Sequence, residues 1–474
     1  MLGESPARTV VHIVLASFIV SVCSSWAAAG PPDARMRGAY RLAENNGWTF
    51  VHLEGTPAEV GFQHGNLLSA EISEDRSIAE LELGRSTGKG WEFFRTEART
   101  MMWPHIEQEY RDELKGIADG IASKGGRLDL WDVVALNGWL EWDYFVKEYK
   151  KLHPEDSARV PPTAEHCSAF VATGSYTRDG RPVLAHNNWS SYIEGERWLI
   201  IFDIVPAQGH RILMDGLPGI IASDDDFGIN NAGIMITETT IGSFDGYDPA
   251  GIPEFVRARK AMQYSSSVGE FARIMEEGNN GGYANTWLVA DAKNGQIGCL
   301  ELGLKNVTFQ YTSDGYYVGS NFPDNPKLIR QETRFNPADS GTSECARRVR
   351  WEQLMEQYKG RIDVAAAEKF LADHYDVRVG KESPSERTLC GHIDVSPRGM
   401  GTWQTPFGPA GAVQNKVVDA SMAQQMTLVA AAGHACGESF DSERFLKLHP
   451  EYSWQKQFLR DMPAKPWTAF SSRK

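Results

Sequence analysis

The spacing of apolar residues changes at Cys167, and this change constrains the fold more than any other feature of the sequence. Before it, residues 44–148 carry apolar side chains mostly at helical spacing. After it come segments typical of strands, at 198–205, 233–240, 285–290 and 296–302. Helical patterns return at 255–275, 344–358 and 418–432. Strand pairs with helices between and after them predict a layered α+β domain.

Local signals support the helical part of this prediction. Thr56 and Pro57 form a turn that leads into a helix, and Asp129 is a suitable N-cap for another helix. Residues 110–121 place Leu114, Ile117, Ala118 and Ile121 on one face. Residues 154–165 are polar and rich in proline, which predicts an exposed linker that ends just before Cys167.

The N-terminal residues have the features of a signal peptide. Arg8 precedes an apolar run over 10–22, and Ala27-Ala28-Ala29 forms a small-residue cleavage site. We therefore expect residues 1–29 to be a signal peptide and the protein to be secreted, periplasmic or lumenal. The run is too short for a membrane span, and no later segment is long, apolar and uncharged, so no integral membrane segment is expected after signal removal.

Charge and cysteine content narrow the possible partners. A net charge of -14 argues against nucleic acid and anionic membrane surfaces as partners, but it leaves uncharged or zwitterionic small molecules open. Of the six cysteines, Cys23 lies in the predicted signal peptide, so five remain. Cys390 and Cys436 lie in Gly/His-rich loops and are the most favourable disulfide pair. No cysteine spacing is a zinc pattern, and neither a metal nor an organic cofactor is expected.

Cys167 itself suggests a specific chemistry. It begins the segment Cys167-Ser168-Ala169 at the head of a predicted hairpin, and His186 lies on the returning strand. If the backbone were cut before Cys167, its new α-amine, with a pKa of about 7.7–8.0, could accept the proton of a thiol whose pKa is about 8.5. A lone cysteine or histidine is more often a buried core residue, so this interpretation needs further support.

That support comes from five motifs that occur in order along the chain. They are Cys167-Ser168-Ala169, His186-Asn187-Asn188-Trp189-Ser190-Ser191-Tyr192, Pro218-Gly219 with Ser223-Asp224-Asp225-Asp226-Phe227, Gly233-Ile234 with Glu238-Thr239-Thr240-Ile241, and Tyr283-Ala284-Asn285-Thr286-Trp287. In these motifs the chain resembles the phospholipase B-like (lama ancestor) family of cysteine-nucleophile Ntn hydrolases. That family is related to acyl-CoA:isopenicillin N acyltransferase and penicillin V acylase.

The resemblance implies a four-layer αββα sandwich and self-cleavage between His166 and Cys167. Residues 30–166 would then be an N-terminal helical segment and linker, either released or retained as a small chain. Residues 167–474 would be the catalytic chain. The implied substrate is a small molecule with an acyl amide or ester bond, of fatty-acyl or phospholipid type.

Candidate site residues follow from the motifs and from the chemistry. Cys167 would be the nucleophile, His186 would orient it or donate to a substrate carbonyl, and the Asn285 amide would stabilise an oxyanion. Asp225 or its neighbour Asp226 would hold the α-ammonium group or Arg387. Trp189 and Thr239 are candidate substrate contacts.

The chain departs from the family pattern at two positions. The family segment Ala-Arg-Ser-Asp-Leu is matched only loosely around Arg387. Ser190 stands where the acyltransferase branch has an aspartate, which places the chain with the phospholipase B-like branch.

Two other classes of function remain open at this point. One is a papain-like cysteine peptidase, in which Cys167 pairs with a distant histidine such as His392 or His434 and no cleavage occurs. The other is a catalytically silent secreted binding protein that has kept the same fold.

Overall fold

The computed structural model describes residues 1–3, 33–158, 167–197, 199–224, 227–399 and 406–472. Residues 35–474 form one compact unit. Its larger sheet has nine strands, of which β2 and β5 are parallel neighbours and all other neighbours are antiparallel. In spatial order these strands are β1 (Tyr40–Arg41), β2 (Thr49–Gly55), β5 (Ile200–Pro206), β6 (Ile212–Gly216), β7 (Gly228–Asn230), β8 (Ile234–Thr240), β9 (Asn285–Asp291), β10 (Ile297–Leu302) and β11 (Val307–Thr312).

The second sheet has six strands, and all of its neighbours are antiparallel. In spatial order they are β12 (Gly315–Gly319), β3 (Cys167–Thr173), β4 (Val183–Ser191), β15 (Ala410–Asp419), β16 (Thr427–Ala432) and β17 (Thr468–Ser471). A separate short hairpin joins β13 (Tyr375–Asp376) to β14 (Lys381–Glu382).

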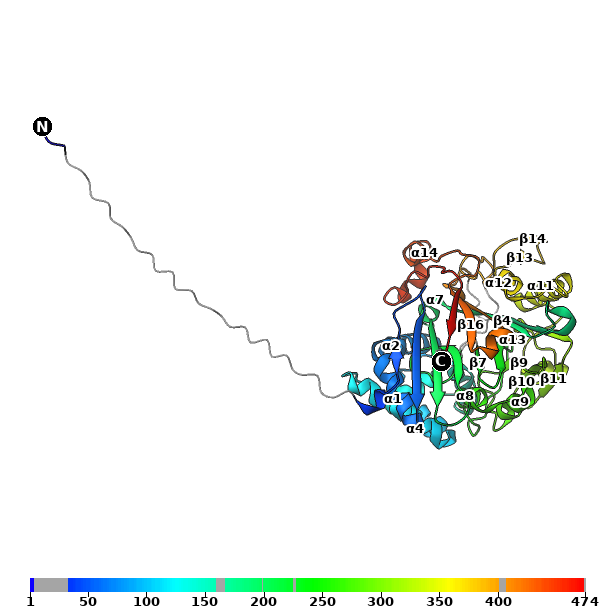
Figure 1. Cartoon of the computed structure of the whole chain (residues 1–474), viewed down its shortest axis with the longest axis horizontal. Helices are drawn as coiled ribbons and strands as arrows, with labels where there is room; N and C mark the ends of the chain where they lie inside the picture. The colour runs from blue at the N-terminus through cyan, green and yellow to red at the C-terminus, as the bar shows by residue number, and fades with distance from the viewer. Residues whose placement is uncertain (4–32, 159–166, 198, 225–226, 400–405, 473–474) are drawn as a thin grey trace. The chain divides into compact units, whose positions relative to one another are not determined.

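Most of the described helices fall into groups that cover the outer faces of the two sheets, whereas α13 (Ala420–Gln424) packs against the cluster between them (Figure 1). The described helices are α1 (Pro57–Leu67), α2 (Ser69–Thr87), α3 (Trp91–Glu97), α4 (Gln108–Ser123), α5 (Leu130–Asn137), α6 (Trp142–Leu152), α7 (Tyr192–Gly195), α8 (Glu254–Tyr264), α9 (Val268–Glu276), α10 (Pro326–Glu332), α11 (Ser343–Gln357), α12 (Val364–Leu371), α13 and α14 (Ser442–Leu448).

Three apolar clusters define the layers. One lies between the two sheets and joins, for example, Val171 of β3 to Leu288 of β9. A second packs helices such as α4 and α8 against the nine-stranded sheet. A third packs α11 and α12 against the six-stranded sheet through residues such as Trp351. This is the expected α+β arrangement of two stacked sheets between helical layers, so the predicted four-layer αββα sandwich is confirmed.

Helices α1 and α4 approach each other closely because glycines line their contact. A Cβ atom built on Gly61 would lie 1.9 Å from the Glu113 carbonyl oxygen, and one on Gly120 would lie 2.2 Å from the Phe62 carbonyl oxygen. Only a residue without a side chain fits such spacing. The approach also buries His64 of α1, whose ring accepts a hydrogen bond from the Gly219 backbone at 2.8 Å.

Several local predictions are confirmed. The Thr56 and Asp129 side chains cap α1 and α5, each in a complete capping box. The strands expected near 198–205, 233–240, 285–290 and 296–302 are β5, β8, β9 and β10. Residues 255–275 form two helices instead of one, because Ser267 caps α9 through the Glu270 backbone N–H and starts a new helix.

The helix predicted over 418–432 is wrong. The chain there leaves β15, makes the short helix α13 capped by Asp419, and returns as β16. Pairing decides the outcome: β15 lies between β4 and β16 in the middle of the sheet, where both of its edges are hydrogen-bonded. Valine suits such a position, and β15 carries Val413, Val417 and Val418. Within 44–148 the structure also has a strand, β2, which pairs with β5.

Among the described residues, no helix combines the length and the hydropathy that crossing a membrane requires. The predicted signal peptide lies almost wholly outside the described residues.

Candidate active site

Cys167 is the first residue of β3 and points into the layer between the two sheets. Its strand neighbours alternate, with Ala169 and Val171 in the core between the sheets and Phe170 in the cluster beneath the helices α11 and α12. Cys167 therefore shares the inner face, and it is buried. Its Sγ lies 3.6 Å from the Asn188 side-chain oxygen on the paired strand β4.

The backbone nitrogen of Cys167 has a fixed partner. It donates to Oδ1 of Asn321 at 3.3 Å, and the Asn321 amide nitrogen donates in turn to the Thr240 carbonyl at 2.9 Å. Asn321 adopts a φ of 63°, a left-handed conformation that asparagine tolerates better than most residues. An acceptor is thus held at the nitrogen that cleavage would convert to an α-amine.

The structure brings together two of the predicted residues and adds a third that sequence analysis missed. One ligating atom each of Cys167, His186 and Glu238 lies within 4.8 Å of the other two. His186 comes from β4 and Glu238 from β8, and both are buried. Glu238 belongs to one of the five motifs, but its motif alone gave no reason to assign it a role. This group offers a thiol, an imidazole and a carboxylate, which suits proton transfer around a nucleophile.

Asn285 lies next to this group, at the start of β9. In the amide orientation that satisfies its neighbours, its nitrogen donates to Glu238 Oε2 at 2.8 Å and to the Ala284 carbonyl at 3.2 Å. Tyr283 donates to the other Glu238 oxygen at 3.2 Å. Both N–H bonds of the Asn285 amide are therefore directed at protein acceptors. The structure joins Asn285 to Cys167 through Glu238.

The arginine beside Cys167 is Arg347 of α11, which sequence analysis did not select. Its guanidinium donates to the Cys167 carbonyl at 2.5 Å, to Ser168 Oγ at 3.1 Å and to Asn321 Oδ1 at 2.8 Å. Arg347 is fully buried, and this burial lowers the pKa of its guanidinium to about 10. The dipeptide Ala346-Arg347 matches the first two residues of the family segment Ala-Arg-Ser-Asp-Leu, which was aligned with Arg387 instead. This match is the sequence feature that could have identified Arg347.

Arg387 lies in a different set of contacts. Its guanidinium forms an ion pair with the buried carboxylate of Asp376, at 3.0 and 2.7 Å from Oδ2. Asp376 therefore holds Arg387, where an aspartate of the 224–226 motif had been expected. Asp225 and Asp226 lie outside the described residues.

The two predicted substrate contacts lie on different faces of their sheets. Trp189 is on the face of β4 opposite His186, and its ring stacks on the Arg347 guanidinium, with Cζ 4.4 Å from the ring centroid. Thr239 of β8 points across the inner layer, since a Cβ atom on Gly319 of β12 would lie 2.5 Å from its Oγ1. Contact of either residue with a substrate stays a prediction.

The histidines of the papain-like alternative lie in another cluster. The rings of His392 and His434 stack with centroids 4.0 Å apart, and His392 Nε2 lies 3.6 Å from the Cys436 sulfur. His434 also contacts Tyr192 and the Cys390 carbonyl. Cys390 and Cys436, which the sequence favoured as a disulfide pair, lie close together, but both are free thiols in the structure. The histidine beside Cys167 is His186.

The fold and this site define the class of protein: a two-sheet α+β protein with a buried cysteine at the head of a central strand, facing a histidine and a carboxylate. Residues 86–331, just over half of the chain, match the family described as phospholipase B. The chain therefore belongs to the phospholipase B family.

Individual relatives are distant. Phospholipase B of Crotalus adamanteus is 24% identical over 303 residues, which is 56% of this chain and 51% of the relative. An uncharacterised Archaeoglobus fulgidus protein is 26% identical over 307 residues, 60% of this chain and 49% of that protein. The acyl-coenzyme A:6-aminopenicillanic-acid-acyltransferase 40 kDa form of Emericella nidulans is 26% identical over 48% of this chain and 57% of its own length.

The chain thus spans about half the length of the curated relatives that it matches. Among solved structures, a variant of conjugated bile acid hydrolase from Clostridium perfringens is similar, with a TM-score of 0.33 and 12% identity over 56% of this chain and 89% of that one.

Proposed function

We propose that this protein is an exported, self-cleaving Ntn hydrolase that cleaves acyl amide or ester bonds with Cys167 as its N-terminal nucleophile. One observation carries the proposal: the buried Cys167 begins β3, its sulfur lies beside His186 and Glu238, and its nitrogen faces Asn321. Membership of the phospholipase B family and the similarity to an acyltransferase agree with acyl chemistry.

Maturation would break the peptide bond between His166 and Cys167. The Cys167 thiol would attack the His166 carbonyl, transfer the acyl group from nitrogen to sulfur, and release the peptide nitrogen as an α-amine. Water would then hydrolyse the thioester, which frees the thiol and leaves His166 with a carboxylate. Residues 30–166 would become the small chain and residues 167–474 the catalytic chain. Asn321 and Arg347 would hold the new terminus, because one accepts from its nitrogen and the other donates to its carbonyl.

Turnover would use the same atoms. The α-amine would take the thiol proton, and the thiolate would attack the acyl carbonyl of the substrate. Collapse of the tetrahedral intermediate would expel an alcohol or amine, which takes its proton from the α-ammonium. Water would complete the cycle by hydrolysing the acyl-thioester.

Other residues would support these steps. Asn285 would donate to the oxyanion by giving up its longer contact, the 3.2 Å bond to the Ala284 carbonyl. His186 would orient the thiol. Asp225 would face the α-ammonium, while Arg387, in the loop before β15, would act through its ion pair with Asp376 of β13. Thr239 would contact the substrate from the inner layer, whereas Trp189 would contact it from the outer face of β4.

The proposed substrates are small molecules of fatty-acyl or phospholipid type. Membership of the phospholipase B family supports this substrate class. The net charge of -14 agrees with an uncharged or zwitterionic substrate. The proposed signal peptide at residues 1–29 would deliver the protein to a secreted, periplasmic or lumenal location.

The test compares two cysteine variants on a panel of fatty-acyl amides and phospholipid esters. Cys167→Ala should abolish hydrolysis. Cys299→Ala is the matched control, because Cys299 lies in β10, a strand that carries none of the candidate site residues. Iodoacetamide should inactivate the wild type with label on Cys167. Full activity in folded Cys167→Ala, or inactivation that follows labelling of Cys299, would exclude Cys167 as the nucleophile.

A further inference from the structure

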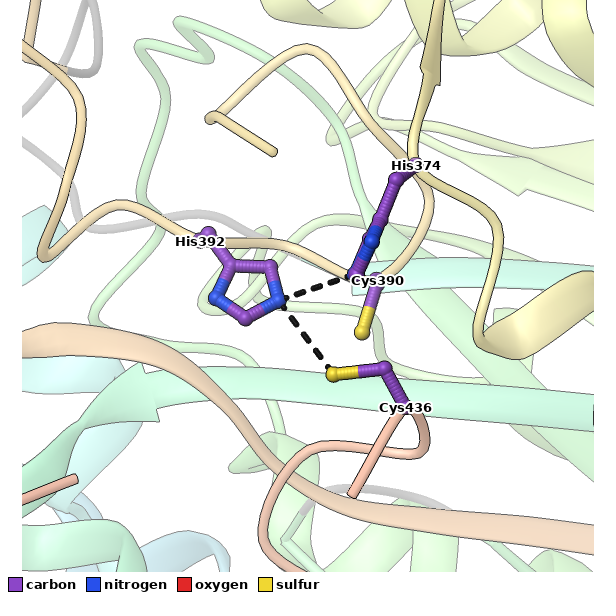
Figure 2. Close-up of side chains that lie close together, drawn as sticks. All are labelled: His374, Cys390, His392 and Cys436. Atoms are coloured by element: carbon purple, nitrogen blue, oxygen red, sulfur yellow. Dashed lines mark hydrogen bonds between the residues drawn. The ribbon is translucent and has the colours of Figure 1, made fainter. Parts of the chain in front are cut away.

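Four metal-ligating side chains converge away from Cys167. They are His374, Cys390, His392 and Cys436, and one ligating atom of each lies within 4.8 Å of the other three (Figure 2). His374 immediately precedes β13, Cys390 and His392 lie in the loop between β14 and β15, and Cys436 follows β16. Cys390 and His392 are buried, and the other two are half-buried.

The distances within this group fit a tetrahedral metal site. His392 Nε2 lies 3.1 Å from His374 Nε2 and 3.6 Å from Cys436 Sγ. A tetrahedral zinc ion with bonds of about 2.0–2.1 Å to nitrogen and about 2.3 Å to sulfur separates two nitrogens by about 3.4 Å and a nitrogen from a sulfur by about 3.6 Å. The Cys390 sulfur lies within the same 4.8 Å limit of the other three ligating atoms, so the four side chains share one centre.

The surroundings of His392 orient it as a metal ligand. Its other ring nitrogen, Nδ1, faces the carboxylates of Asp394 at 4.0 Å and Glu438 at 3.9 Å. A carboxylate on that side favours a proton on Nδ1, which leaves the Nε2 lone pair directed toward His374 and Cys436. The stacked ring of His434 supports one face of His392 and is itself held by the Tyr192 hydroxyl at 2.9 Å.

We propose that these four residues bind one zinc ion in a structural site. Two thiolates and two imidazoles are a ligand set that zinc prefers, and four protein ligands leave no open position for water. The site is separate from the nucleophile chemistry proposed for Cys167. It escapes a search for zinc spacing in the sequence because its ligands come from three segments, and only the fold assembles them.

The zinc would fix a loop that supports the candidate active site. Gly391, between two of the ligands, packs on the Trp189 ring, where a Cβ atom would lie 2.2 Å from Cε2. Two residues earlier, the Leu389 carbonyl accepts a hydrogen bond from Asn187 at 3.0 Å. Trp189 and Asn187 belong to β4, the strand that carries His186. Loss of zinc should therefore weaken the packing of this loop on the outer face of β4.

A disulfide between Cys390 and Cys436 is the competing arrangement, and it would remove both thiolate ligands. Metal analysis of purified wild type after dialysis should give about one zinc per chain. Cys390→Ser/Cys436→Ser should lose it, whereas the control Cys299→Ser should keep it. Cobalt bound in place of zinc should give the visible absorption of tetrahedral thiolate coordination.

A measurement on the wild type keeps the proposal testable if the double variant does not fold. Wild-type protein is denatured in the presence of a chelator and then alkylated. No reductant is added, so that any disulfide stays intact. Alkylation of both Cys390 and Cys436 supports the zinc site, provided that native protein protects them until the chelator is added. A Cys390–Cys436 disulfide in this sample, or zinc retained by a folded double variant, would overturn the proposal.

Discussion

Replacing Arg347 by methionine tests the account of how Cys167 is held. Arg347 is fully buried, and its guanidinium donates to the Cys167 carbonyl, Asn321 Oδ1, Ser168 Oγ and Ser343 Oγ. Methionine fills a similar space without donors. Ser343 Oγ keeps its bond to the Glu386 carbonyl, but the Cys167 carbonyl loses its charged donor.

The magnitude follows from these contacts. A buried acceptor left unsatisfied costs about 1–3 kcal/mol, and the contact of the guanidinium with the Trp189 ring adds about 1–2 kcal/mol when it is desolvated. Asn321 Oδ1 keeps its bond from the Cys167 nitrogen, which limits the loss there. We expect Arg347→Met to lower the free energy of unfolding by roughly 2–5 kcal/mol.

The assay is urea unfolding, read as a shift in the midpoint at constant m. Arg348→Met is the matched control, because Arg348 is on the same helix and forms surface ion pairs with Glu352 and Asp324. Such pairs contribute about 0–1 kcal/mol. Equal losses in the two variants, or no loss in Arg347→Met, would refute the role assigned to Arg347.

Three further predictions address the site, the acid stability and the core. Asn285→Ala should lower kcat per folded molecule by roughly 10²–10³, and it should also cost about 1–3 kcal/mol of stability because Glu238 Oε2 loses a buried donor; a normal kcat per folded molecule would remove Asn285 from the site. Burial lowers the pKa of His64 from 6.5 to about 3, so the stability that neutral His64 provides is present above pH 6.5 and lost as the pH falls toward 3. The stability of wild type should fall by up to about 1.4 kcal/mol per pH unit in that window, and urea unfolding of His64→Gln at pH 7 and 5 should show a smaller slope. Lys416 and Asp215 form a fully buried ion pair at 2.5 Å, so Lys416→Met should cost about 3–5 kcal/mol in urea unfolding. Adding Asp215→Leu should recover most of this loss, because the unpaired carboxylate is then removed as well. Additive losses in the double variant would contradict this prediction.

Local sequence signals predicted the parts of the fold that depend on neighbours in the chain. The caps at Thr56 and Asp129 and the strands around 285–302 follow from patterns a few residues long. The failure at 418–432 has a different cause. There, pairing with β4 on one side of β15 and β16 on the other outweighed the helical spacing, and no local pattern reports such pairing.

The same distinction applies to the site. Cys167 and His186 were predicted together because one hairpin, β3 and β4, carries both. Glu238 and Arg347 come from β8 and α11, and packing of the layers brings them to Cys167. The sequence favoured Arg387 instead, because a loose motif match does not show which arginine the fold buries beside the nucleophile. The candidate zinc ligands were also missed, because they come from three separate segments that only the fold brings together.

N-terminal sequencing and intact mass of the purified mature protein test the central claim most directly. Self-cleavage predicts two chains, the second starting at Cys167, and a Cys167→Ala protein that stays in one piece. An active wild-type protein whose chain runs unbroken through 166 and 167 would contradict the proposal that Cys167 acts as an N-terminal nucleophile.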